Sequence, residues 1–168
     1  MNETKKWSFS QTSEAGASLL NWWRGLEESR GERAELRRAS EPTEVAFCSG
    51  FHRLLNDLRQ GLAVSAESLA VVAGVVVHAK TRDDSQIFAA QMAAPKSAEG
   101  SARVSELRFR RLLQIPDRPA LYQPLVRTIR LLGGAVNIVS LADDIYFWGD
   151  HVRKNWAYTY YEKAPSKR

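Results

Sequence analysis

The sequence predicts an all-α fold, a compact helical bundle of about eight or nine short helices in two packed halves. Three observations predict it. Apolar residues recur at intervals of three and four along most of the chain, which is the period of an amphipathic helix. Most of these segments begin at a capping residue or end at glycine or proline. Apolar residues make up 44% of the 168 residues, enough for a core, so wholesale disorder is excluded.

Short helices are expected to follow one another through the N-terminal part of the chain. Ser13 and Glu14 start the first, and glycine, serine and proline separate the next ones. The expected helices cover about 13–29, 32–39 and 40–58, the last with a break near 49–50.

The valine-rich segment over 65–80 is compatible with two structures. Val71, Val72 and the run Val75–Val77 would suit a buried strand. However, the segment is long and rich in alanine, and Ser65 stands where an N-terminal cap belongs. Because no other segment offers a strand partner, we predict a helix.

The C-terminal part of the chain continues the same pattern. A turn is expected at 81–85, a short helix at 87–94, and a linker at 96–101 that divides an N-terminal half, 13–95, from a C-terminal half, 102–162. Gly133-Gly134 ends one of the later helices. Those later helices are expected over 102–113, 120–132, 135–148 and 149–161. We expect flexible tails at 1–12 and 163–168.

Composition excludes several classes of protein. The longest valine-rich run without charge, Leu69–Val77, is far shorter than the roughly 20 residues of a membrane helix. No apolar stretch typical of a signal peptide follows Met1. Cys48 is the sole cysteine, so neither an internal disulfide nor a cysteine-rich zinc site can form. We therefore expect a cytoplasmic protein with no membrane partner.

The sequence offers little for catalysis. His52, His78 and His151 share no metal-binding spacing, and His78 is interpreted as a core or helix-end residue. Adjacent Asp143 and Asp144 diverge by about 100° on a helix, so they do not readily aim at one ion. We predict no catalytic residue, no metal and no cofactor. A small enzyme using Asp143, Asp144 and His151 is the least favoured hypothesis.

Arginine gathers in one segment. The formal net charge is +5, and residues 101–131 account for it with seven arginines against Glu106 and Asp117. Arg127 and Arg130 fall opposite the apolar arc of their helix. In the helix predicted over 102–113, the apolar arc lies around Phe109 and Arg108 lies on its flank. The arginines that fall away from that arc are Arg103, Arg110 and Arg111. A solvated helix face would also produce this pattern. A second group, partly neutralised by Glu32 and Glu35, comprises Arg30, Arg33, Arg37 and Arg38.

Arginine-faced helices could line a groove for a phosphate backbone, which would bind nucleic acid without reading its sequence. No helix-turn-helix with a polar recognition helix and no zinc finger is visible. Most tryptophans and tyrosines lie at core spacing, so we interpret them as packing residues rather than stacking platforms.

The order of several motifs resembles a known family. These motifs are Trp22-Trp23-Arg24-Gly25-Leu26, Gly31 to Ala39, Val104 to Leu113, Leu125 to Leu132 and Asn137 to Ile145, followed by Trp148, Trp156 and Tyr160-Tyr161. Over roughly 18–162 the chain resembles the CasB-type small subunit of the type I-E CRISPR Cascade surveillance complex. The resemblance implies a non-catalytic helical subunit, present in two copies, that stabilises the R-loop.

The resemblance also implies partners and site residues. The partners are the backbone and large subunits of Cascade, a second copy of the chain, the guide RNA, the target DNA and the displaced single strand. The nucleic-acid-binding residues that the resemblance implies are Arg37, Arg38, Arg108, Arg110, Arg111, Arg127 and Arg130. Arg53 is a weaker candidate, and Arg103 joins the set because it falls away from the apolar arc of its helix. Thr128 departs from the expected pattern, which leaves open that Arg127 points toward a neighbouring subunit. The alternative is a protein–protein adaptor whose arginines meet acidic partner surfaces.

Overall fold

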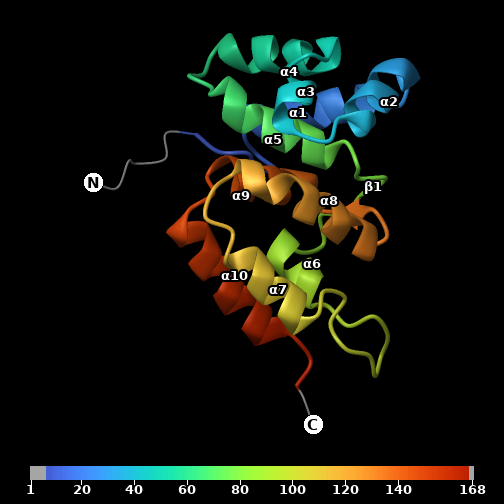
Figure 1. Cartoon of the computed structure of the whole chain (residues 1–168), viewed down its shortest axis with the longest axis vertical. Helices are drawn as coiled ribbons and strands as arrows, with labels where there is room; N and C mark the ends of the chain where they lie inside the picture. Colours follow the sequence, from blue (N-terminus) through green and yellow to red (C-terminus); the bar gives the residue numbers. More distant parts are fainter. Residues whose placement is uncertain (1–6, 167–168) are drawn as a thin grey trace.

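The computed structural model describes residues 7–166, and within them the chain is almost wholly helical (Figure 1). Ten α-helices are present in this part of the chain, eight of them of seven residues or more, which confirms the predicted fold class. The helices are α1 (Glu14–Gly25), α2 (Arg30–Arg38), α3 (Pro42–Val45), α4 (Ser49–Arg59), α5 (Ala66–Val76), α6 (Phe88–Ala93), α7 (Glu106–Leu113), α8 (Tyr122–Leu131), α9 (Ile138–Tyr146) and α10 (Asp150–Lys163). A 3-10 turn, η1 (Pro119–Leu121), leads into α8.

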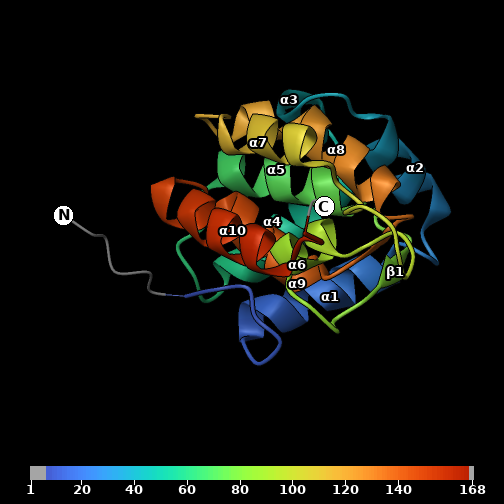
Figure 2. The same ribbon diagram turned by 90° about the horizontal axis from the view of Figure 1, so that it is seen from below.

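Helix α5 is the centre of the fold. Every residue from Ser68 to Val76 is buried, and the helix packs against α3, α4, α8 and α9. Figure 2 shows α7 and α8 on one side of α5 and α1 on the other. The prediction of a helix here is confirmed, and the Ser65 hydroxyl caps it by accepting a hydrogen bond from the Ser68 amide. A helix apolar on all faces is expected where neighbours surround it.

A two-stranded parallel sheet departs from the predicted secondary structure. Strand β1 (Thr81–Arg82) lies in the predicted turn, and β2 (Ala135–Val136) opens the segment predicted as helix over 135–148. Gly133 and Gly134 adopt φ of 69° and 80°, which turns the chain sharply after α8. The Gly134 carbonyl then accepts hydrogen bonds from the amides of Lys80 and Thr81. The pairing joins segments more than 50 residues apart, so local periodicity does not predict it.

Helix α7 begins later than predicted. Residues 102–104 are not helical: Ala102 bridges to Pro95, and the Val104 amide donates to the Met92 carbonyl. The helix starts only after Ser105, whose hydroxyl accepts from the Arg108 amide. This cap places the arginines of α7 in one regular helix from Glu106 onward.

Part of the expected N-terminal tail is packed. Phe9 is 3% exposed, and its amide donates to Asp143 Oδ1 at 2.9 Å. The Trp7 ring contacts Tyr146 and Phe147. Trp7 and Phe9 thus pack against the fold. The flexible tails at 1–12 and 163–168 stay a prediction; residues 1–6 and 167–168 lie outside the described residues.

The division into halves at 96–101 stays a prediction. Helix α6 precedes this linker in sequence but packs on α9 and α10, which follow it. The buried apolar residues form one cluster that runs through both expected halves. Within residues 7–166, no helix is both long and apolar enough to cross a membrane.

Candidate nucleic-acid interface

A groove of about 500 Å³ lies between α7 and α8. The first set of lining residues comes from α7 and the residues just after it: Arg108, Arg111, Leu112 and Ile115. The second set comes from α8: Pro124, Arg127, Thr128 and Leu131. Arg130 of α8 also lines the groove. Each set has the spacing i, i+3, i+4 and i+7, which is one face of a helix. We call this site the α7/α8 groove.

Core packing turns these two faces toward the groove. On α7, Phe109 is fully buried and stacks on Tyr160, with ring centroids 3.9 Å apart and planes 7° from parallel. On α8, Leu125, Val126 and Ile129 are buried. Because the apolar arc of each helix is committed to the core, the arginines are left on the open side.

The four arginines of the groove are Arg108, Arg111, Arg127 and Arg130, and all four are exposed. Within residues 7–166, none of their guanidinium groups makes a side-chain hydrogen bond or an ion pair. Four uncompensated charges around one concavity form a site for an anion, and guanidinium suits phosphate because it can donate two parallel hydrogen bonds.

Thr128 lies in the lining of the groove between its arginines. Its side chain is buried, and its hydroxyl donates to the Pro124 carbonyl at 2.8 Å. Arg127 and Arg130 both line the groove despite the intervening Thr128. Arg127 lies one helical turn after Pro124 and one turn before Leu131, on the same face of α8. A contact of Arg127 with a neighbouring subunit stays a prediction.

The other predicted arginines lie outside this groove. Arg38, Arg103 and Arg110 are exposed. Arg53 pairs with Glu32 at 2.7 Å. Arg37 is partly buried, and its Nε donates to the Val77 carbonyl at 2.8 Å, tying α2 to the end of α5. Their roles in binding stay predictions.

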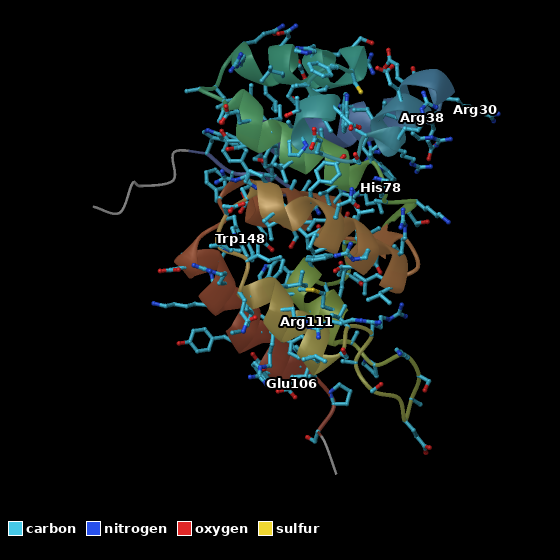
Figure 3. The ribbon with its side chains drawn as sticks, in the orientation of Figure 1. Arg30, Arg38, His78, Glu106, Arg111 and Trp148 are labelled. Carbon is cyan, nitrogen blue, oxygen red and sulfur yellow. The ribbon has the colours of Figure 1, made fainter. Side chains whose placement is uncertain are left out.

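A second, smaller cleft lies where α2 meets the segment that follows α5. It has a volume of about 180 Å³ and its lining includes Trp23, Arg33, Arg37 and Lys80. Arg37 of this cleft and Arg130 of the α7/α8 groove both act electrostatically on His78. In Figure 3, His78 lies between Arg38 of α2 and Arg111 of α7. Lys80 is not among the residues predicted from the sequence, since no periodicity marks it.

Burial and two arginines depress the pKa of His78. Desolvation is the larger cause, followed by Arg130 and Arg37, and together they lower this pKa from 6.5 to about 4. The imidazole is therefore neutral near pH 7. The interpretation of His78 as a helix-end residue fits its place just after α5, where its amide donates to the Val75 carbonyl.

This depressed pKa predicts a loss of stability in acid. An unfolded chain protonates His78 near its ordinary pKa of 6.5, and the folded chain only near 4. Between these values the unfolded state binds more protons, so a falling pH favours unfolding. We expect the free energy of unfolding, measured with urea, to fall more from pH 6.5 to 4 in the parent than in His78→Gln. Equal falls in the two proteins would refute this assignment.

The residues considered for catalysis have structural roles. Asp143 accepts from the Phe9 amide, and Asp144 accepts from Trp156 Nε1 at 2.7 Å. His151 is exposed and faces Asn155 on its own helix. In the part of the chain that the structure describes, no three His, Cys, Asp or Glu residues gather in a metal-binding arrangement. Burial, followed by Glu35, raises the pKa of Cys48 to about 11, so its thiol is protonated at neutral pH.

Fold and site together define a helical binding protein whose distinguishing feature is an arginine-lined groove. The model of the family "CRISPR-associated protein Cse2" matches residues 32–161. The chain therefore belongs to this family, Cse2/CasB, the non-catalytic small subunit of the type I-E Cascade complex.

Two solved structures share the fold. One is a chain of E. coli Cascade bound to a PAM-containing double-stranded DNA target; it has 22% sequence identity and a TM-score of 0.66, and the match covers 89% of this chain and 95% of that chain. The other is CasB from Thermus thermophilus, also with 22% identity and a TM-score of 0.66, covering 90% of this chain and 99% of that chain. No match was found among curated proteins.

Proposed function

We propose that this chain stabilises the R-loop of a type I-E Cascade complex by holding nucleic-acid backbone in the α7/α8 groove. The single observation that carries the proposal is the four guanidinium groups that line one concavity with no protein partner among the described residues. The similarity to a chain of E. coli Cascade bound to a double-stranded DNA target supports the proposal.

Energetics explain why a few phosphate contacts are enough. Exchanging a DNA duplex for an RNA–DNA heteroduplex is nearly balanced in free energy, so modest backbone contacts shift the equilibrium. Base pairing with the guide RNA reads the sequence, and the protein needs only to recognise charge and backbone. Arginines on exposed helix faces meet that requirement.

We assign the remaining contacts around this groove. Arg103 and Arg110, and Arg37, Arg38 and Arg53, are assigned further backbone contacts outside the α7/α8 groove. The groove engages the displaced single strand or the target strand of the heteroduplex with the guide RNA. A second copy of the chain, with the backbone and large subunits of Cascade, completes the assembly.

The test is binding of the purified full chain to single-stranded DNA over a salt series. Each neutralised phosphate contributes a slope of about −0.7 in the logarithm of affinity against the logarithm of salt. Four groove contacts therefore predict a slope of about −3, with little dependence on sequence. A chain that shows no affinity for bare strands, and that keeps its protein partners after nuclease treatment, would instead be the adaptor for acidic surfaces.

A further inference from the structure

We propose that the α7/α8 groove holds one unpaired nucleobase of a single strand, with the phosphates on either side of that base bound by its arginines. This inference rests on the proposed function and names the part of the nucleic acid that the groove takes. The observation behind it is that the groove has an apolar lining as well as a charged one.

The apolar lining comes from both helices. Leu112 and Ile115 face it from the α7 side, and Pro124 and Leu131 from α8. Leu131 is 40% exposed, so a large aliphatic side chain of α8 is left only partly covered by the rest of the fold. A site for phosphate alone needs only donors and charge, whereas aliphatic side chains between arginines suit a flat apolar face.

The size of the groove agrees with a base rather than a bare phosphate. Its volume of about 500 Å³ lies within the range of roughly 300–1,000 Å³ that small-molecule sites occupy. In a duplex the base faces are stacked on their neighbours, so only an unpaired strand presents a face to the groove. Single-strand binding sites combine a basic groove along the backbone with side chains on which bases stack. Arginine planes, with the aliphatic side chains beside them, take the stacking role in this groove.

The chemistry of the lining predicts tolerance for any base. Arg108, Arg111, Arg127 and Arg130 offer guanidinium planes for stacking and donors for the flanking phosphates. The Thr128 hydroxyl already donates its hydrogen to the Pro124 carbonyl, so it has none left for a base edge. Stacking uses the flat face that every base has, so we expect little discrimination among the four bases.

The experiment compares two strands that differ only in their bases. The full chain is titrated with a fluorescent oligothymidylate and with an abasic strand of equal length and phosphate number, at one salt concentration. Stacking of one base predicts about tenfold tighter binding of oligothymidylate. Leu131→Ala is expected to bring the ratio of the two affinities close to one. Leu107→Ala is the matched control, because Leu107 is 59% exposed on α7 outside the groove, and it is expected to keep the ratio.

The outcomes separate this inference from the function on which it rests. If the parent binds both strands with equal affinity, the backbone function stands and the base site is overturned. If Leu131→Ala and Leu107→Ala lower the ratio of the two affinities equally, the base site is also overturned, because the preference for bases would then not come from the α7/α8 groove. If neither strand binds, the proposed function fails and the base site fails with it.

Discussion

Replacing all four arginines of the groove with alanine is expected to weaken single-strand binding by about a hundredfold or more at moderate salt. The four are Arg108, Arg111, Arg127 and Arg130. A hydrogen bond to a charged group contributes about 1.5–3 kcal/mol where it forms, and exposure to solvent reduces that value. Even about 0.7 kcal/mol from each arginine accumulates to a factor of about a hundred. The salt slope should become about three units shallower.

A matched variant separates the groove from overall charge. Arg24, Arg30, Lys96 and Lys154 are exposed and lie outside the groove, so replacing them with alanine lowers the net charge by the same four units. This control is expected to lose much less affinity than the groove variant. If the two variants lose the same affinity, long-range attraction rather than the groove accounts for binding. Urea unfolding of both proteins shows whether the fold is retained.

Trp156→Ala is expected to have the largest effect on stability. The side chain is 2% exposed, its ring centroid lies 5.0 Å from that of Trp148 and 5.6 Å from that of Phe88, and its Nε1 donates to Asp144. Emptying such a site costs about 3–5 kcal/mol. Because the free energy of unfolding of small proteins is only about 5–15 kcal/mol, Trp156→Ala would remove much of the stability. Urea titration of parent and variant measures the difference.

Two further variants show whether burial of the Trp156 side chain causes the expected loss of stability. Trp156→Phe keeps an aromatic ring but loses the hydrogen bond, so a smaller loss is expected than with alanine. Tyr158→Ala, on the same helix but at a residue 74% exposed, should change the free energy of unfolding by less than about 0.5 kcal/mol. A Trp156→Ala protein within about 1 kcal/mol of the parent would contradict the assignment of this side chain to the core.

Much of the helical fold could be predicted from local signals. Ser13, Ser65 and Gly133-Gly134 mark helix boundaries through side-chain caps or positive φ, and these are properties of a few neighbouring residues. The strand pair and the packing of Phe9 on Asp143 could not be predicted in this way. Both depend on contacts between segments more than 50 residues apart, which periodicity does not encode.

The candidate site also combines features that local sequence predicts with features that depend on distant contacts. The two arginine faces follow from the helical period, but their meeting in one groove depends on the loop between α7 and α8. Trp148 Nε1 holds that loop by donating to the Ile115 carbonyl, and Arg118 Nε donates to the Ile145 carbonyl. Arg118 thus serves the fold, although by composition it counts among the basic residues of 101–131. Arg37 and Arg53 likewise have protein partners that spacing alone does not reveal.

The most direct test of the central claim is the lifetime of the R-loop in a reconstituted type I-E complex. The complex is assembled with the parent chain or with the variant lacking the four groove arginines, and equal incorporation of the two chains is checked first. Dissociation of a fluorescent target is then followed after challenge with excess unlabelled DNA. The account predicts a markedly shorter lifetime with the variant. An unchanged lifetime in a fully assembled complex would contradict it.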